Sequence, residues 1–364
     1  MKIVSLFDGM ACGMLAMLGA NINVDEYYAY EIDKYAVQTA THNFPNIIEC
    51  GDVFKADFTQ YKDVDFIVGG SPCTYWSIAQ KNNRETEASG LGWELFSQYV
   101  RALNEIKPMF FIYENNKSMS KAIRESITEA FGFDAICINS ALVSAQNRQR
   151  LYWVGKRNED GTYSRVDVQQ PEDRGILLRD ILDGAMDLTS KDKAWTLTAS
   201  YNGAVAWNTI ERSQRNMAVV PIGAAQRGRY VDGEKTEQHI EVREDGKSNC
   251  LTTVQKDSLV CAPVRIGQYG KGGQGQRIYS VIGKSVTLSA NGGGQGAKTG
   301  LYKINLPDGD YIIRNLSVNE CKRLQTVPEW YEFPVSNAQA YKMLGNGWTV
   351  DVIIHLIKSC LTKI

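Results

Sequence analysis

The chain has 364 residues, of which 43% are hydrophobic and 22% are charged, as is ordinary for a globular protein in water. Its net charge is -1, so the chain as a whole does not have the positive charge of many nucleic-acid-binding proteins. No apolar run approaches the roughly 20 residues that a membrane helix needs, and the N-terminal apolar segment is too short for a signal peptide. We therefore expect a cytoplasmic protein without a membrane partner.

The cysteine pattern argues against a structural metal or a disulfide framework. Eight cysteines are scattered at positions 12, 50, 73, 137, 250, 261, 321 and 360, with no CxxC pair, and the chain has only three histidines. Zinc sites need clustered cysteine and histidine ligands, so we expect no metal cofactor. Most of these cysteines are expected to be small buried side chains.

Strand-like and helix-like segments alternate over the first 155 or so residues. Strands are expected at 2–7, 27–32, 47–50, 66–68, 109–113, 133–138 and 151–156, with helices at 14–18, 35–42, 91–106 and 121–131. This alternation predicts an α/β fold built on a doubly wound, mostly parallel sheet.

The pattern changes from about residue 160 to residue 305, where helical periodicity is weak. Residues 201–305 hold 16 of the 32 glycines and 14 Lys+Arg against 8 Asp+Glu, so positive charge is concentrated in this segment. Such segregation favours a nucleic-acid-facing module, although the charge alone is equally well explained by a solvated β-rich insert. The segment predicts a smaller, irregular, β-rich domain.

Helices return near the C-terminus. Ser317 and Glu320 have the Ser-x-x-Glu spacing of a capping box, which predicts a helix through residue 324. Two more helices are expected at 337–344 and 350–361, separated by Gly345-Asn346-Gly347.

Polar or glycine-rich segments follow each of the first five expected strands. They comprise residues 7–13, 31–33, 51–53, 71–73 and 114–116. Because the carboxyl ends of parallel strands meet at one edge of a sheet, and ligands bind outside that edge, we expect one shared site.

The first of these segments predicts a nucleoside-containing cofactor. A glycine-containing loop after one strand and Glu31 after the next, about 20 residues later, form the pattern in which a carboxylate accepts hydrogen bonds from ribose hydroxyls. The loop lacks a strict G-x-G-x-x-G and there is no Walker lysine pattern, which favours S-adenosylmethionine over a dinucleotide or ATP. Asp52 would suit the adenine amino group.

Cys73 and Glu114 predict the chemistry. A thiolate is a strong nucleophile, and positive neighbours such as Arg148 and Arg150 favour its formation. Thiolate attack at C6 of cytosine, with N3 protonated by an acid such as Glu114, makes C5 nucleophilic enough to accept a methyl group. These residue types are therefore those that methylation of a pyrimidine carbon requires.

The motifs resemble those of the DNA (cytosine-5) methyltransferase family, from Ser5 to about Leu356. They occur in the family's order. The motifs are Phe7 to Gly13, Pro72-Cys73, Glu114-Asn115, Gln146-x-Arg148-x-Arg150, the segment that begins with Arg314-Asn315-Leu316-Ser317 and ends with Arg323-Leu324-Gln325-Thr326, and Gly345-Asn346-Gly347. The resemblance implies a catalytic domain at 1–158 and 314–364 and a target-recognition domain at 159–313. It also implies that Arg148 orients the base or the thiolate, and that loops such as Gly267 to Arg277 read DNA.

The resemblance further implies a set of site residues. Catalytic roles fall to Cys73, Glu114, Arg148 and Arg150, with cytosine flipped out of duplex DNA. Cofactor contacts fall to Phe7, Asp8, Gly9, Met10, Ala11, Cys12, Glu31, Ile32, Asp52, Val53, Pro72, Leu95, Asn346 and Trp348.

Three details are similar to the de novo branch of the family, namely Ser5 to Gly9, Val143-Ser144-Ala145 and Trp348, whereas Asn346 follows the wider bacterial pattern. We expect a bacterial or phage enzyme that is monomeric, with a cognate restriction endonuclease as a further candidate partner. The family usually has Glu-Asn-Val where this chain has Glu114-Asn115-Asn116, which leaves the effect of Asn116 open. The target DNA sequence cannot be read from the chain.

Three other kinds of protein fit these motifs less well. A tRNA cytosine-5 methyltransferase would have a smaller recognition segment. A catalytically silent DNA-binding homologue would not need Cys73, Glu114 and Arg148. An amino-directed methyltransferase would have an aromatic residue after a Pro-Pro pair, whereas this chain has Pro72-Cys73-Thr74.

Overall fold

The computed structural model describes residues 1–77, 84–181, 183 and 317–362. Between these parts it describes only residues 194–195, 199, 217–221, 224–227, 230–231, 234–235, 239–242, 266–268, 277–278, 302–306 and 309–315. Most of the expected DNA-reading stretch from Gly267 to Arg277 lies outside the described residues.

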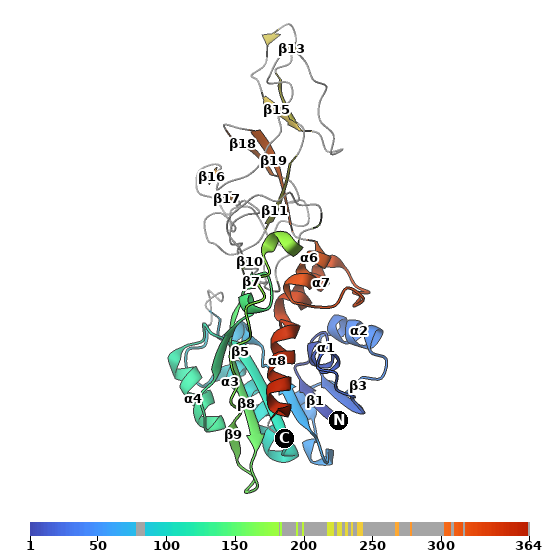
Figure 1. Ribbon diagram of the computed structural model, residues 1–364, viewed down its shortest axis with the longest axis vertical. Helices are drawn as coiled ribbons and strands as arrows, with labels where there is room; N and C mark the ends of the chain where they lie inside the picture. The colour runs from blue at the N-terminus through green and yellow to red at the C-terminus, as the bar shows by residue number, and fades with distance from the viewer. Residues whose placement is uncertain are drawn as a thin grey trace.

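An eight-stranded mixed sheet forms the centre of the fold (Figure 1). Its order is β3-β2-β1-β4-β5-β8-β6, with β9 paired to β8; the first five strands run parallel, and β8 is antiparallel to β5 and β6. The strands are β1 (Lys2–Leu6), β2 (Glu26–Tyr30), β3 (Ile48–Glu49), β4 (Phe66–Gly69), β5 (Phe110–Asn116), β6 (Ile136–Asn139), β8 (Gln149–Arg157) and β9 (Tyr163–Arg165). The predicted α/β fold with a mostly parallel sheet is confirmed.

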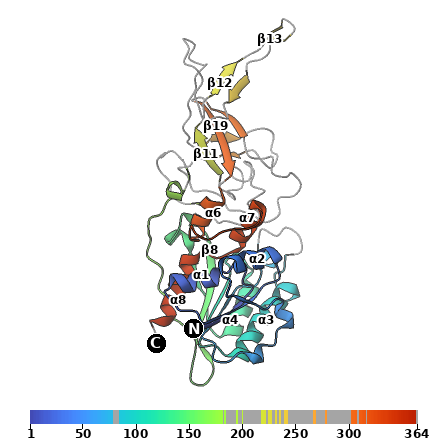
Figure 2. The same cartoon turned by 90° about the vertical axis from the view of Figure 1, so that its right-hand side faces the viewer.

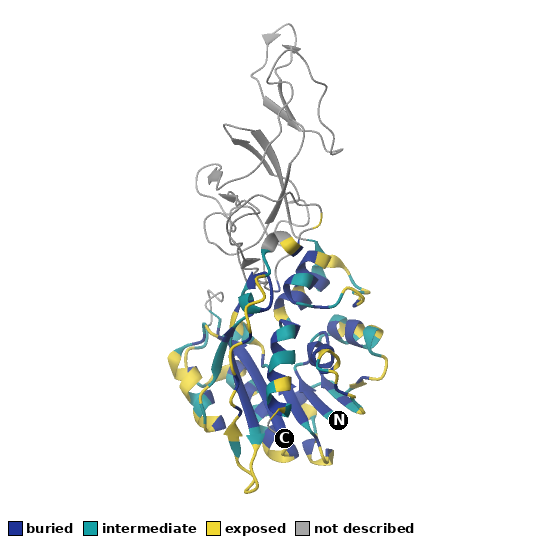
Figure 3. Cartoon of the chain, viewed as in Figure 1, coloured by how far each residue is buried: buried dark blue, intermediate teal, exposed yellow. Residues whose placement is uncertain are grey.

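Helices cover both faces of this sheet (Figures 1 and 2). They are α1 (Cys12–Gly19), α2 (Lys34–Asn43), α3 (Gly90–Ile106), α4 (Lys121–Phe131), α6 (Val318–Leu324), α7 (Asn337–Asn346) and α8 (Val350–Leu361). Successive side chains of a strand point to opposite faces. On β5, Phe110 and Ile112 accordingly join the core under α1 and α8, whereas Phe111 and Tyr113 join the core under α3 and α4. The central strands β4 and β5 are therefore buried on both sides (Figure 3).

The helix ends follow from local sequence. Ser317 accepts the Glu320 backbone N–H while the Glu320 side chain accepts the Ser317 N–H, so the predicted capping box is confirmed. Ser120 caps α4 by accepting the Ile123 N–H, and Gly132 ends it in the left-handed region at φ 80°. The helices expected at 121–131 and 350–361 are found at those residues.

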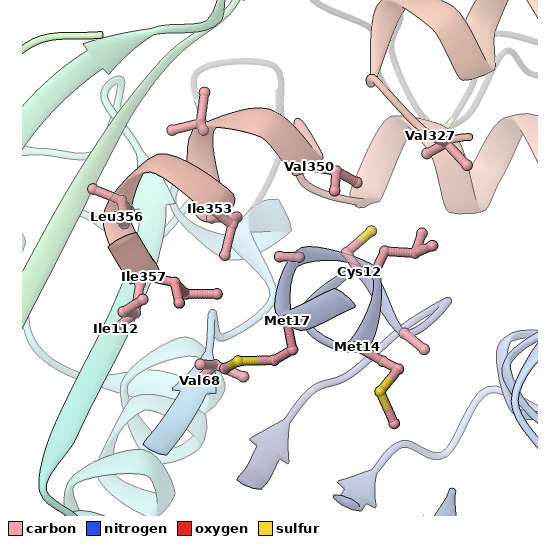
Figure 4. Close-up of a cluster of buried hydrophobic side chains, with 14 of the residues drawn as sticks. Cys12, Met14, Met17, Val68, Ile112, Val327, Val350, Ile353, Leu356 and Ile357 are labelled. Carbon is pink, nitrogen blue, oxygen red and sulfur yellow. The ribbon is translucent and has the colours of Figure 1, made fainter. Parts of the chain in front are cut away.

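The C-terminal helix returns to the first helix. Figure 4 shows Ile353, Leu356 and Ile357 of α8 in one cluster with Met17 of α1 and Val68 of β4. Apolar burial on this scale stabilises the fold at roughly 25 cal/mol per Å². Residues from the two ends of the chain therefore share one core.

A buried hydrogen-bond network fixes the segments around this helix. The Gln146 side chain donates to Gln325 Oε1 (2.7 Å) and to the Leu324 carbonyl. Thr349 Oγ1 also bonds Gln325 Oε1 (2.9 Å), and it accepts from Ser140 Oγ (2.8 Å). Buried polar groups are costly unless paired, so this network specifies how the last 46 described residues, 317–362, meet the sheet.

The central part of the chain contributes antiparallel strands. β19 (Gly309–Asn315) pairs with β11 (Met217–Pro221) and β18 (Tyr302–Leu306), and β12 (Ala224–Arg227) pairs with β15 (His239–Val242). The remaining two-stranded pairs join β13 (Tyr230–Val231) to β14 (Glu234–Lys235), β16 (Ile266–Gln268) to β17 (Arg277–Ile278), and β10 (Ala194–Trp195) to β7 (Gln146–Asn147).

The chain continues to pack against the large sheet after residue 158. β9 extends the large sheet, and Val166, Val168 and Ile181 belong to its core. Among the helices of the described residues, none is long and apolar enough to cross a membrane.

Replacing Ile353 with alanine tests the packing of α8. Ile353 is fully buried, so the change should lower the free energy of unfolding by about 2–5 kcal/mol through lost burial and a residual cavity. Ile48→Ala, at a position 45% exposed, is the matched control and should cost less than about 1 kcal/mol. Chemical denaturation followed by circular dichroism measures both, and equal losses would contradict a core position for α8.

Candidate active site

The site lies where the strand order reverses. β1 has β2 on one side and β4 on the other, and the helices that follow β1 and β4 along the chain pack on opposite faces of the sheet. Ligands of open α/β sheets bind at such switch points. The expected convergence of the strand-end motifs at one edge agrees with this topology.

The loop after β1 has an unusual backbone. Phe7 and Ala11 both have φ 58°, and Gly9 has φ 62°. Positive φ costs a residue other than glycine on the order of 1–3 kcal/mol, and such strain concentrates at functional sites. Glu31 Oε2 accepts the Gly9 N–H (2.8 Å), and the Tyr331 hydroxyl donates to the Met10 carbonyl (2.6 Å). These contacts hold the loop in its strained form.

Three carboxylates gather around this loop. Tyr27 donates to Asp8 Oδ1 (2.6 Å), while Asp8 Oδ2 is buried without a hydrogen-bond partner among the described residues. Burial raises the pKa of Asp8 to about 6. The pKa of Glu49 rises to about 7, through burial first and then through the charges of Asp8 and Glu31.

Glu49 was missed by the sequence analysis, because a carboxylate on a two-residue strand carries no motif. Its two carboxylate oxygens are buried and, within the described part of the chain, have no hydrogen-bond partner. The grouping of Asp8, Glu31 and Glu49 disfavours phosphate and suits a cofactor with a positive charge. This surplus of carboxylates fits S-adenosylmethionine and does not fit a dinucleotide.

The other expected cofactor residues lie on neighbouring segments. Ile32 is 78% exposed beside Glu31, so its side chain is free to pack against a flat ligand. Asp52 accepts the Phe54 N–H (3.0 Å) and precedes the buried Val53. Leu95 lies on the second turn of α3, partly buried, and Asn346 is exposed at the end of α7.

Two glycines allow the strand ends to come together. A Cβ on Gly69 would lie 2.5 Å from the Leu6 carbonyl oxygen, and one on Gly70 would lie 2.6 Å from the Glu114 carbonyl oxygen. Real side chains do not tolerate such distances to backbone atoms. The close approach of β1, β4 and β5 therefore requires glycine at these positions.

Cys73 begins a short 3₁₀ turn, Cys73–Tyr75, with Pro72 before it. The loop is held by Asn115, whose side-chain amide donates to the Ser71 carbonyl (3.1 Å), and by the Ser71 hydroxyl, which bonds the Tyr113 hydroxyl (2.7 Å). The Ser71 hydroxyl thus has a specific buried partner. Asn115 was part of a motif but not an expected site residue.

Both oxygens of the Glu114 carboxylate are engaged. Arg150 Nε lies 3.1 Å from Oε1, and Trp348 Nε1 donates to Oε2 at 3.0 Å. β8 carries Arg150 directly opposite Asn116 on β5, which explains the proximity of the charged pair. The Glu114 side chain is 12% exposed and that of Arg150 is 15% exposed, so solvent screens their attraction only weakly.

Burial raises the pKa of the Cys73 thiol. The positive charge of Arg150 opposes this rise most strongly, Glu114 reinforces it, and Arg148 also opposes it. The thiol is therefore mainly protonated near neutral pH and loses its proton as the pH rises or when a base accepts it.

Arg148 lies deeper than Arg150. Its guanidinium donates to the Gly345 carbonyl (3.2 Å) and the Gly347 carbonyl (2.9 Å), and burial lowers its pKa to about 9. These bonds show that Arg148 holds the turn after α7 in place. The role expected for Arg148 on the base or the thiolate is a separate prediction.

Asn116 adds a polar link that a valine could not make. Its side-chain Nδ2 lies 3.5 Å from the Cys73 carbonyl, and its Oδ1 accepts from the Ser118 hydroxyl (2.7 Å). The departure from the family pattern at this position therefore connects β5 to the nucleophile loop. No group of three or more metal-ligating side chains occurs among the described residues.

Comparisons with known proteins match the chain to one family. The family model for C-5 cytosine-specific DNA methylases matches residues 1–362. The Type II methyltransferase M.HhaI of Haemophilus parahaemolyticus is 26% identical over 366 residues, covering 98% of this chain and 93% of that protein. The orphan methyltransferase M.SPRI of Bacillus phage SPR is 26% identical over 440 residues, covering 99% and 97%.

A solved structure shares the fold. The methyltransferase EhMeth of Entamoeba histolytica superposes with a TM-score of 0.55 at 12% identity, covering 100% of this chain and 98% of that one. Members of the matched family use S-adenosylmethionine as the methyl donor. The match over nearly the whole length shows that this chain belongs to the C-5 cytosine-specific DNA methylase family.

Proposed function

We propose that this DNA (cytosine-5) methyltransferase acts through Cys73 as nucleophile, with Glu114 as the acid and Arg150 as its charged partner. The observation that carries the proposal is the grouping of these three side chains at the switch-point edge of the sheet, beside the strained loop after β1. The substrate is a cytosine flipped out of duplex DNA, because its C6 and C5 are inaccessible in the stack.

We assign the bond-forming and proton-transfer steps to Cys73 and Glu114. The Cys73 thiolate adds to C6 while Glu114 protonates N3, so that C5 becomes enamine-like. S-adenosylmethionine supplies an electrophilic methyl group for C5. Water accepts the C5 proton, the N3 proton returns to Glu114, and departure of Cys73 as a thiolate then restores the aromatic ring. Arg150 stabilises the carboxylate and thiolate charges during these proton transfers.

For the cofactor, we propose a pocket formed by the loop from Phe7 to Cys12 with Glu31, Ile32 and Asp52. Glu31 would accept ribose hydroxyls, and the exposed Ile32 would pack on the adenine. The carboxylates of Asp8 and Glu49 support a positively charged ligand. Pro72, Val53, Leu95, Asn346 and Trp348 complete the proposed set.

For the DNA, we propose that the target-recognition domain lies within residues 159–313, after the segment through Ile181 that packs on the large sheet. The support is the excess of basic residues and glycines in this segment, since phosphate contacts supply much of DNA affinity. Monomeric state, cytoplasmic location and a partner endonuclease stay predictions.

Base-resolution methylation sequencing of plasmid DNA, treated with enzyme and S-adenosylmethionine, tests the proposal. It should reveal 5-methylcytosine within one short recurring sequence. A parallel reaction with tRNA separates the nearest alternative. Methylation of tRNA alone, or of neither substrate, would refute the assignment.

Replacing Cys73 with serine should lower turnover on the order of 10³-fold or more, because a hydroxyl is not ionised near neutral pH. The wild-type enzyme should form a covalent adduct on duplex DNA that contains 5-fluorocytosine, visible as a shifted band after denaturation. Cys137→Ser, at a partly buried thiol outside the site, is the control. Full activity of the Cys73 variant would rule out the mechanism.

Replacing Arg150 with glutamine should raise the pKa of Cys73 further, because the largest opposing charge is removed. The thiolate fraction at a given pH then falls, and the pH profile of thiol alkylation moves to higher pH. Iodoacetamide modification of Cys73, followed by mass spectrometry across a pH series, measures this directly. An unchanged or downward-shifted profile would contradict the assigned role.

Replacing Asn116 with valine, the usual residue of the family, removes the link between β5 and the Cys73 carbonyl. A neutral hydrogen bond contributes about 1 kcal/mol, so we expect adduct formation to slow by roughly fivefold. DNA affinity should stay the same, as measured by fluorescence anisotropy. An unchanged rate of adduct formation would show that this contact does not position the nucleophile.

A further inference from the structure

The indole of Trp348 contacts the carboxylate that the proposed mechanism uses as the acid. Trp348 Nε1 donates to Glu114 Oε2 at 3.0 Å, across 234 positions of sequence. Arg150 binds the other oxygen, Oε1, at 3.1 Å. Two donors on different oxygens fix both the position and the plane of a carboxylate, which a single contact would leave free to rotate.

The backbone that carries this indole is itself held in place. The Gly347 carbonyl accepts from Arg148 (2.9 Å) and from the Gln325 side chain (3.2 Å). The sulfur of Cys12, the first residue of α1, lies beside the backbone of residues 347 and 348. A Cβ on Gly347 would lie 3.2 Å from that sulfur, so the loop and α1 are in close contact.

The Glu114 carboxylate keeps hydrogen-bonding directions that neither Trp348 nor Arg150 uses. An ionised carboxylate has about four lone-pair directions, and the indole and the guanidinium use two of them. One remaining direction on the carboxylate can carry the proton for N3 of cytosine, and another can accept the amino group. The indole therefore orients Glu114 without competing for those positions.

We propose that Trp348 is a positioning residue for Glu114: its indole N–H sets the orientation of the carboxylate, and its backbone ties that orientation to the cofactor loop at Cys12. The proposal rests on the proposed function of Cys73 and Glu114. It differs from a cofactor contact of the Trp348 ring, because it depends on the N–H group rather than on the ring surface.

A cofactor-free reaction isolates this role. Without a methyl donor, the Cys73 thiolate adds to C6, Glu114 protonates N3, and C5 takes a proton from water. Loss of the original C5 hydrogen and then of the thiolate regenerates cytosine, so tritium at C5 is released into water. Release of tritium from duplex DNA containing [5-³H]cytosine therefore requires Glu114 and no cofactor.

Trp348→Phe keeps an aromatic ring and removes the N–H. We expect tritium release to slow by roughly 10-fold, a fraction of what general acid catalysis contributes. Trp330→Phe is the matched control. Trp330 is 55% exposed and its ring makes an edge-to-face contact with Phe44, so tritium release by this variant should be unchanged. For Trp348→Phe, the affinity for S-adenosylmethionine, measured by calorimetry, should fall by a smaller factor than the rate of tritium release.

A second variant removes the risk of a folding defect. Incorporation of β-(3-benzothienyl)alanine at position 348 replaces the N–H by sulfur and keeps the shape of the ring, so it should slow release as Trp348→Phe does. If the wild type releases no tritium, the proposed mechanism itself fails. If the wild type releases tritium and the benzothienyl variant matches it, the role assigned to Trp348 is refuted.

Discussion

The return of the C-terminal segment to the edge of the sheet is the constraint on which the site depends. The buried hydrogen bonds among Gln146, Gln325 and Thr349 specify where this segment lies. None of these groups could be buried at low cost without the others, because an unpaired polar group in a core is expensive. Trp348 is the sequence neighbour of Thr349, so this network also places the Trp348 side chain. The Trp348 indole then links the C-terminal segment to Glu114 on β5.

The electrostatics of the edge are divided between two sides. Asp8, Glu31 and Glu49 make the loop after β1 negative, which matches a phosphate-free, positively charged methyl donor. On the other side, Arg150 faces Cys73 and Glu114, which matches the negative charge that would develop on sulfur and carboxylate in the proposed addition. In the proposed reaction, this division keeps the positive charge of the cofactor apart from that of the arginine.

Close packing of backbone at the edge has a direct consequence for the chemistry. Gly69 and Gly70 let β1, β4 and β5 approach each other, and Asn115 and Ser71 then hold the turn that carries Cys73. Asn116 extends the same connection to the Cys73 carbonyl. In the proposed mechanism the neighbours of Cys73 on β5 therefore position the nucleophile, while burial, Glu114 and the arginines set the pKa of its thiol.

The sequence by itself determined the alternation of strands and helices, the capping box at Ser317, and the order of motifs that leads to Cys73 and Glu114, because each is encoded within a few adjacent residues. Only the tertiary structure decided the antiparallel insertion of β8, the attachment of β9, the carboxylate of Glu49 beside the loop after β1, and the contact between Trp348 and Glu114. Those features join residues from separate strands or from opposite ends of the chain. Local propensity carries no information about such pairs, and burial and hydrogen bonding in the folded core select them.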